Sequence, residues 1–263
     1  MAKASFLNLP LVGSVGGYSI YHRKDCAKPI IRAKGGATAE RFWKDPKMAG
    51  SRRNSSNFGG ISTTGKSVRH AMMNVVMLGH SNISGDINSL VSKIKKLSPV
   101  ANKQNQILFN GGLHLLKGYN LNKVNVFDAV VSTPVEFEVN RITHKAILQL
   151  PLLTPGVNVK NPWKLPYFRF VMNLGIIRDM HFDGTKYQSM TPVIADHTIL
   201  ETTEWASVLV THLPQSFEFQ FDNPVFDDHC YLMLSVGIEF GTQVEDGIGA
   251  VKGASCGKIL TVV

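Results

Sequence analysis

The sequence predicts an α+β protein, in which an N-terminal hairpin and a helical region are followed by an antiparallel, β-sandwich-like domain. Two observations lead to this prediction. Before about residue 120, apolar residues recur every three or four positions, which is the period of a helix. After that position they alternate, or gather in short β-branched and aromatic runs between turn residues, as strands do. With 263 residues, 44% hydrophobic and 18% charged, the chain is large and apolar enough to fold around a sizeable core.

Residues 15–33 predict the hairpin, because two runs rich in Tyr, Ile and Val flank a polar turn at residues 22–28. We assign residues 1–36 to this N-terminal arm. Two-stranded hairpins are marginally stable in water, so we expect the arm to pack against another surface. The side chains expected to make that contact are Tyr18, Ile20, Tyr21, Ile30 and Ile31.

Residues 37–120 are expected to form a basic helical region. Asp45 before Pro46 is typical of a helix start. The apolar spacing from 61 to 78 predicts a mostly buried helix, and a shorter helical segment is expected at 113–117. The clearest helix ends at Pro99. Its apolar stripe consists of Ile83, Ile87, Leu90, Ile94 and Leu97.

Residues 121–263 are expected to form the β-rich, sandwich-like domain. Turn residues such as those at 183–184 and 222–224 separate the predicted strands. A hairpin is predicted over 135–150, with its turn at 140–143. Further strands are predicted within 167–177, 205–213, 217–221, 230–240 and 257–263.

Charge is distributed unevenly along the chain. Residues 1–120 contain 18 Lys and Arg against four Asp and Glu, a balance of +14, whereas residues 121–263 contain 10 against 15, a balance of −5. A basic half of this kind indicates a polyanionic partner or a partner surface of opposite charge. Here that acidic surface could belong to another copy of the same chain.

Residues 60–67, GISTTGKS, match the phosphate-loop pattern G-x-x-x-x-G-K-[ST]. A nucleotide site also needs a buried strand before the loop, but the preceding residues, SRRNSSNFG, are polar and basic. A nucleotide site also needs an acidic magnesium ligand after a hydrophobic strand. Asp128 matches this pattern only weakly, and no alternation of strands and helices surrounds it. We therefore interpret GISTTGKS as a small-residue kink where two helices meet.

Other residues that could carry chemistry do not form a recognisable set. Asp227, Asp228, His229 and Cys230 are consecutive, and on a strand their side chains would point to opposite faces, so no metal site is expected. Cys230 lies in an apolar run, where a thiol is usually inert. The three cysteines predict neither disulfides nor a zinc site. We expect no catalytic residues, no cofactor and no small-molecule substrate.

Nucleic-acid binding is the alternative that the basic half suggests. The cations that could form a phosphate-binding face are Lys47, Arg52, Arg53, Lys66 and Arg69. The neighbouring aromatic residues do not form a recognisable RNA-stacking motif.

Several segments of the chain form a familiar combination. They are GSVGGYSIYHRK and IRAKGG near the N-terminus, DPKM…SRRNSSNFG…GKSVRHAM in the helical region, and YLMLSVGIEFG…VKGASCGKILTVV at the C-terminus. Together they resemble a family of uncharacterised proteins from Bacteroidota-type bacteria. The family usually has an acidic residue before the Phe-Gly found here at Phe58-Gly59, and it does not keep the phosphate-loop pattern. The resemblance therefore implies an architecture and no known catalytic residues, and it favours local drift as the origin of GISTTGKS.

The leading hypothesis from the sequence is a non-enzymatic structural protein that assembles with copies of itself into a filament, tube or shell. A nucleic-acid-binding or packaging protein is the alternative, and an NTPase is disfavoured. No apolar run approaches the ~20 residues that span a bilayer, and no clear secretory signal is expected. The location of the protein in or outside the cell is not predicted.

Overall fold

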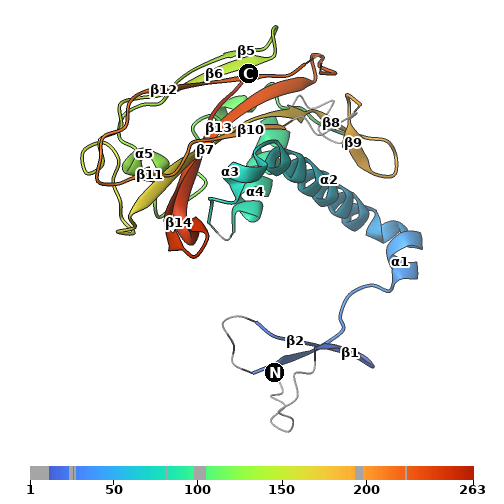
Figure 1. Ribbon diagram of the computed structural model, residues 1–263. Helices are drawn as coiled ribbons and strands as arrows, with labels where there is room; N and C mark the ends of the chain where they lie inside the picture. The colour runs from blue at the N-terminus through green and yellow to red at the C-terminus, as the bar shows by residue number, and fades with distance from the viewer. Residues whose placement is uncertain are drawn as a thin grey trace. The chain divides into compact units, whose positions relative to one another are not determined.

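The structure, a computed structural model, describes residues 12–23, 26, 28–80, 82–97, 105–192, 198–222 and 224–263 (Figure 1). It confirms the α+β class, since helices and antiparallel strands are largely segregated along the chain. The chain divides into two compact units, Met1–Ser55 and Ser56–Val263, which we call unit 1 and unit 2. The expected boundary at residue 36 lies inside unit 1, and the one at residue 120 lies inside unit 2.

Unit 1 contains a three-stranded antiparallel sheet, which we call the N-terminal sheet. Its strands, in spatial order, are β1 (Gly13–Val15), β2 (Tyr18–Tyr21) and β3 (Ile30–Ala33). The predicted hairpin is the β2–β3 pair, and β1 adds a strand that the sequence did not predict.

Short helical segments follow this sheet: α1 (Ala39–Lys44) and the 3-10 helix η1 (Pro46–Met48). The side chain of Asp45 accepts a hydrogen bond from the Lys47 amide, as expected of the residue that caps a helix starting at Pro46. α2 (Ala49–Ala71) begins in unit 1 and continues in unit 2.

Unit 2 holds the remaining elements. Its other helical segments are α3 (Met73–Val76), α4 (Ile83–Leu97), the 3-10 helix η3 (Leu113–Leu115) and α5 (Phe127–Val130). The strands are β4 (Gln106–Ile107), β5 (Glu136–Asn140), β6 (Lys145–Leu150), β7 (Tyr167–Arg178), β8 (Met180–Phe182), β9 (Tyr187–Ser189), β10 (Thr198–Thr202), β11 (Ala206–Ser207), β12 (Gln215–Gln220), β13 (Cys230–Val244) and β14 (Gly247–Val262).

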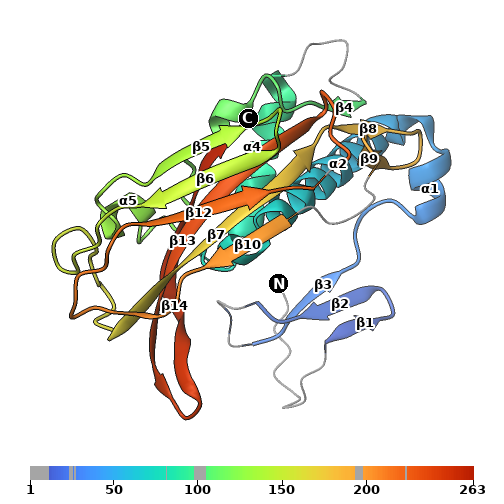
Figure 2. The same cartoon turned by 45° about the horizontal axis from the view of Figure 1, so that its top comes forward.

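Unit 2 is built in three layers (Figure 2). The outer sheet has the order β12-β6-β5, and the central sheet has the order β10-β7-β13-β14, with β11 paired to β7. Side chains of the central sheet alternate between two cores. Phe170 of β7 and Leu232 of β13 face the outer sheet, whereas Ile177 and Met233 face the helices. The third layer is therefore the helices, which cover the other face of the central sheet. A small sheet, β4-β8-β9, completes the unit.

Glycines in the central sheet let the helices approach it closely. A Cβ atom on Gly175 of β7 would clash with the backbone of Ala71, and one on Gly237 of β13 would clash with the end of the Leu78 side chain. A side chain at Gly175 would therefore push the helical layer away from the sheet.

Most predicted elements of unit 2 are confirmed, and two are wrong in part. α4 extends to Leu97 and buries Ile87, Leu90 and Ile94, and its predicted end at Pro99 lies outside the described residues. The helix expected over 61–78 is interrupted at Met72, where α2 ends before α3. The strand expected over 205–213 is reduced to β11, because most of this segment is a loop with exposed apolar side chains.

Candidate functional site

The GISTTGKS segment lies in the interior of α2, which runs through it without a break. The interpretation of a kink between two helices is therefore wrong. The glycines serve helix packing instead, since Gly60 lies against the ring of Tyr187 and Gly65 against Asn88. Thr64 is buried and its hydroxyl donates to the Gly60 carbonyl at 2.9 Å. The amides of this segment lie within a helix, so they do not form a phosphate-binding loop.

Two of the cations expected to bind nucleic acid make hydrogen bonds within the fold. Arg52 donates from Nη1 to the carbonyl oxygens of Phe42 and Asp45, at 2.6 and 3.1 Å. Arg69 donates to Asn88, and partial burial lowers its pKa. The exposed members are Lys47, Arg53 and Lys66. Two of the five cations, Arg52 and Arg69, thus donate hydrogen bonds within the fold, and the other three are available to solvent.

The N-terminal sheet has one apolar face. Alternation along the strands and the observed register place Val15, Tyr18, Ile20, Ile31 and Ala33 on that face, which we call the apolar face. The opposite face carries Ser14, Ser19, Tyr21, Ile30 and Arg32. The five residues expected at a subunit interface are therefore divided, with Tyr18, Ile20 and Ile31 on the apolar face and Tyr21 and Ile30 on the other.

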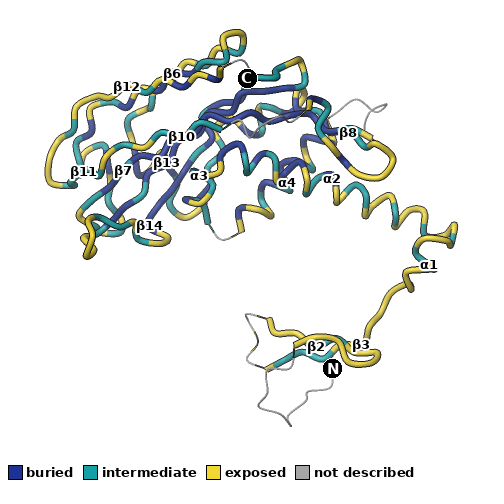
Figure 3. Tube along the Cα trace, turned by 45° about the vertical axis from the view of Figure 1, so that its right-hand side comes forward, coloured by how far each residue is buried: buried dark blue, intermediate teal, exposed yellow. Residues whose placement is uncertain are grey.

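No described residue of unit 1 is buried, as the yellow and teal tube of Figure 3 shows. On the apolar face, Val15 is 64% exposed and Tyr18 is 56% exposed. A sheet normally buries at least one face against another element. The exposures show that no described residue of unit 1 covers the apolar face of this sheet.

A polar cluster lies where β7 and β13 meet, and the sequence did not indicate it. The carboxylate of Asp179 is almost fully buried and accepts a hydrogen bond from the Phe109 amide at 2.7 Å. Its other oxygen lies 3.1 Å from His229 Nδ1 and accepts from the Tyr231 hydroxyl at 3.4 Å. Burial raises the pKa of Asp179. Burial beside this carboxylate also raises the pKa of Tyr231, to about 12.

This cluster corrects one expectation about residues 227–230. Asp227 and His229 precede β13 in a turn, so they do not alternate along a strand. Asp227 accepts hydrogen bonds from the Thr191 hydroxyl and the His229 amide, at 2.7 and 2.9 Å. Cys230 is buried, as expected of an inert thiol. Because the hydrogen bonds of both carboxylates are internal, the arrangement joins β7, the start of β13 and the 105–112 segment.

The described part of the chain contains no group of three or more His, Cys, Asp or Glu placed to hold a metal ion. It does contain buried cations. Arg178 is 5% exposed, and its Nε and Nη2 atoms have no hydrogen-bond partner among the described residues. Lys95 is also buried, but donates to Asn57 and Tyr187, at 2.9 and 2.8 Å, and burial lowers its pKa.

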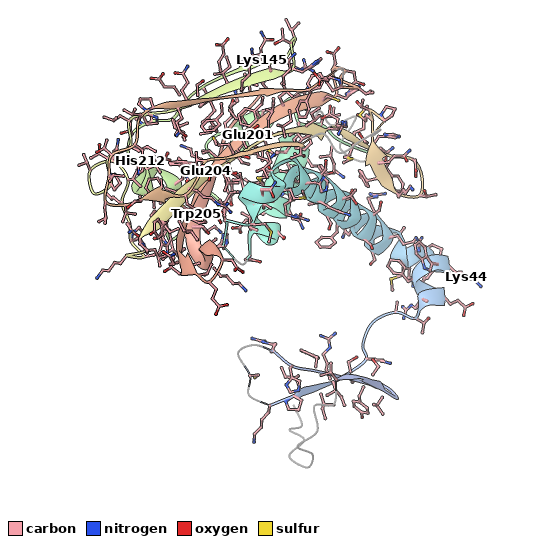
Figure 4. All side chains as sticks on the ribbon, in the orientation of Figure 1. Lys44, Lys145, Glu201, Glu204, Trp205 and His212 are labelled. Carbon is pink, nitrogen blue, oxygen red and sulfur yellow. The ribbon has the colours of Figure 1, made fainter. Side chains whose placement is uncertain are left out.

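The outer sheet has a free edge at β5 in the described structure, where β5 pairs with β6 alone. Glu136 and Glu138 are exposed on its outward face, the face on which Lys145 of β6 lies (Figure 4). Between this edge and β14 lies a groove of about 410 Å³. Apolar residues dominate its lining, chiefly Phe127, Val131, Val135, Phe137 and Leu260.

A second apolar surface lies on two neighbouring loops of unit 2. Leu153 and His212 exchange main-chain hydrogen bonds of 2.8–2.9 Å, which brings the loops together. Their exposed apolar residues are Leu152, Val157, Leu209, Val210 and Leu213. Residues 151–159 and 205–217 contain no Asp, Glu, Lys or Arg. This surface, which we call the loop patch, is an exposed apolar surface, the kind that often marks an interaction site.

Comparisons with known proteins do not indicate a function for the chain. No family model, curated protein or solved structure matches the chain. Within the described residues, no helix is both long and apolar enough to cross a membrane.

Proposed function

We propose that this chain is a non-enzymatic structural protein that assembles with copies of itself into a homopolymer through its N-terminal sheet. The exposure of that sheet's apolar face carries the proposal. Val15 and Tyr18 leave most of their surface in water, and no described residue of unit 1 is buried. Such a sheet gains stability when its apolar face and its open edges are covered by another surface.

Charge supports a partner that is another copy of the chain. Unit 1 contains 11 Lys and Arg against three Asp and Glu, a balance of +8, and unit 2 contains 17 against 16, a balance of +1. The acidic charge is local: residues 121–263 have a balance of −5, and Glu136 and Glu138 are exposed on β5. A contact between the N-terminal sheet of one copy and an acidic region of the next joins two unlike surfaces. When contacts of this kind repeat head to tail, they form a ring if the rotation closes and an open polymer if it does not.

Sedimentation velocity at low salt tests the proposal. We expect the full chain to sediment far above its monomer mass of 28.9 kDa, and a chain lacking residues 1–34 to sediment as a monomer. Raising the salt concentration should slow assembly, since exposed charges are screened over about 10 Å at 0.1 M. A full chain that stays monomeric at high concentration and low salt would contradict the proposal, as would a deletion variant that assembles equally well.

Two tyrosines of β2 provide a matched pair of substitutions. Tyr18 lies on the apolar face and Tyr21 on the opposite face of the same strand. Tyr18→Ser is expected to weaken assembly more than Tyr21→Ser, because only the first removes apolar area from the covered face. Equal effects would mean that the apolar face is not the one that is covered.

Nucleic-acid binding is the second candidate, and the +8 balance of unit 1 is the observation that favours it. The test is direct. A packaging protein would purify with high absorbance at 260 nm and bind duplexes of any sequence, with an affinity that falls steeply as salt rises. Assembly without nucleic acid favours the structural role.

A further inference from the structure

We propose that β3 of one copy pairs antiparallel with the free edge of β5 in the next copy, so that the N-terminal sheet extends its neighbour's outer sheet. This inference rests on the proposed function and names the acceptor surface for it. β3 is itself an edge strand, since it pairs with β2 alone among the described residues. Two open edges can continue one sheet through main-chain hydrogen bonds.

Main-chain hydrogen bonds of the two sheets show which main-chain groups point away from each sheet. The Lys34 amide donates to the Gly17 carbonyl of the β1–β2 turn, so residues 30, 32 and 34 direct their main-chain groups toward β2. Ile31 and Ala33 therefore direct theirs to the free edge. The Phe221 amide donates to the His144 carbonyl, so the main-chain groups of odd-numbered β6 residues point to β5.

The same alternation applied to β5 completes the comparison of the two edges. Glu136 and Glu138 pair with odd-numbered residues of β6, so their main-chain groups point into the sheet. Phe137 and Val139 direct theirs to the free edge. On both edges, then, the free main-chain groups belong to residues whose side chains lie on the apolar side, and the charged residues lie on the opposite side.

This match sets the strand direction. In each sheet, the charged residues of the edge strand direct their main-chain groups inward. When each sheet is viewed from its charged face with the edge strand running upward, the free edge therefore lies on the same side in both. Joining them with both charged faces on one side requires one sheet to be turned by half a rotation, and β3 then runs antiparallel to β5. A slip of one residue would place the Arg32 side chain on the apolar side, beside the groove.

One register satisfies both faces. It places Arg32 opposite Glu138 and Lys34 opposite Glu136, two cross-strand pairs of opposite charge. On the other side, the apolar face of the N-terminal sheet would meet the groove between β5 and β14. Phe137, which is 41% exposed, and Leu260 line that groove. The pairing therefore covers the apolar face and gives the carboxylates of β5 partners.

Charge reversal followed by mixing tests the pairing in the full chain. Glu136→Lys/Glu138→Lys gives a chain with a basic β5 edge, and Arg32→Glu/Lys34→Glu gives a chain with an acidic β3 edge. Each variant alone should need about tenfold more protein to assemble, because both cross-strand pairs become repulsive. An equimolar mixture should assemble like the parent, since each chain then meets an edge of opposite charge. The control, Glu245→Lys/Asp246→Lys, makes the same charge change in the β13–β14 turn and should assemble normally.

Disulfide trapping tests the register independently. In a Cys26→Ser background, a chain with Arg32→Cys mixed with a chain with Glu138→Cys should form an intermolecular disulfide, because directly opposed residues lie within bonding range. Arg32→Cys mixed with Glu136→Cys should not. Failure of the mixture to restore assembly, or equal cross-linking of the two pairs, would overturn the inference. If reversals on β5 have no effect while Leu209→Asp in the loop patch stops assembly, the acceptor is that patch and self-assembly still stands.

Discussion

Replacing Gly60 by Ala should destabilise the protein, and replacing the adjacent Gly59 should stabilise it. Both glycines lie inside α2, so both substitutions remove the same backbone freedom from the unfolded chain, a gain of about 0.5–1 kcal/mol. Their surroundings differ. A Cβ atom on Gly59 meets nothing within 4 Å, whereas one on Gly60 lies 2.6 Å from the Tyr187 ring.

The Tyr187 ring cannot move aside easily. Ordinary carbon contacts are about 3.5–4.0 Å, so the ring would have to shift by about 1 Å. Tyr187 is 7% exposed, its hydroxyl accepts a hydrogen bond from Lys95, and its ring packs against Phe182. Overpacking of this kind costs about 1–3 kcal/mol. Because the backbone contribution is common to both variants, that cost is also the expected difference between them.

Thermal or urea unfolding of the two variants measures this difference. We expect Gly60→Ala to melt roughly 2–12 °C below Gly59→Ala, from the usual relation between free energy and melting temperature for chains of this size. Equal stability of the two variants would refute the packing of α2 on β9. It would also remove the structural reason for the first glycine of GISTTGKS.

Three further predictions concern single side chains. Lys66→Ala should change stability by less than about 0.5 kcal/mol, because Lys66 is exposed, and magnesium-dependent ATP binding that this change abolishes would contradict our interpretation of GISTTGKS. Leu90→Asp should cost several kcal/mol, measured by urea unfolding, because it puts a charge into the core between α4 and the central sheet; a cost below 1 kcal/mol would mean that α4 does not pack there. Asp179 has a raised pKa, so its protonated form stabilises the fold below about pH 3.8 and that contribution is lost as pH rises through the folded-state pKa. The stability of the parent relative to Asp179→Asn should therefore fall as pH rises above 3.8, and a difference independent of pH would refute the burial of this carboxylate.

Local patterns in the sequence were sufficient to predict most individual elements. The stripe of α4 and the alternation of β5 and β6 are strong because each element buries one face, and burial imposes a period on the side chains. The prediction failed at 205–213, where apolar residues that resemble a buried strand are exposed in a loop. A run of apolar residues shows that a segment is hydrophobic, but it does not show that the segment is buried. The position of this segment depends on the neighbouring loop, because main-chain pairing of Leu153 with His212 joins the two loops.

The break at Met72 and the polar cluster around Asp179 depend on contacts between distant segments. Met72 is fully buried and lies in an apolar stretch that shows no helix breaker. Its neighbour Ala71 packs directly on Gly175, about 100 residues away in sequence, and α3 continues over the central sheet. Asp179, likewise, has partners from Phe109, His229 and Tyr231. Neither feature leaves a local signature, because the residues that cause it are brought together only by the fold.

The candidate assembly surface shows the same division between local and tertiary information. The alternation in residues 135–139 already indicates that Glu136 and Glu138 share one face and that Phe137 lies on the other. Whether that strand is central or at an edge is decided by topology, since β6 lies between β12 and β5 and leaves β5 with one partner among the described strands. On a central strand, exposed carboxylates would indicate only that one face of the sheet is solvated. At an edge, the same carboxylates discourage pairing between identical strands and leave the edge selective for a basic one. The charges of β3 and β5 therefore become informative together only after the fold has placed both strands at the edges of their sheets.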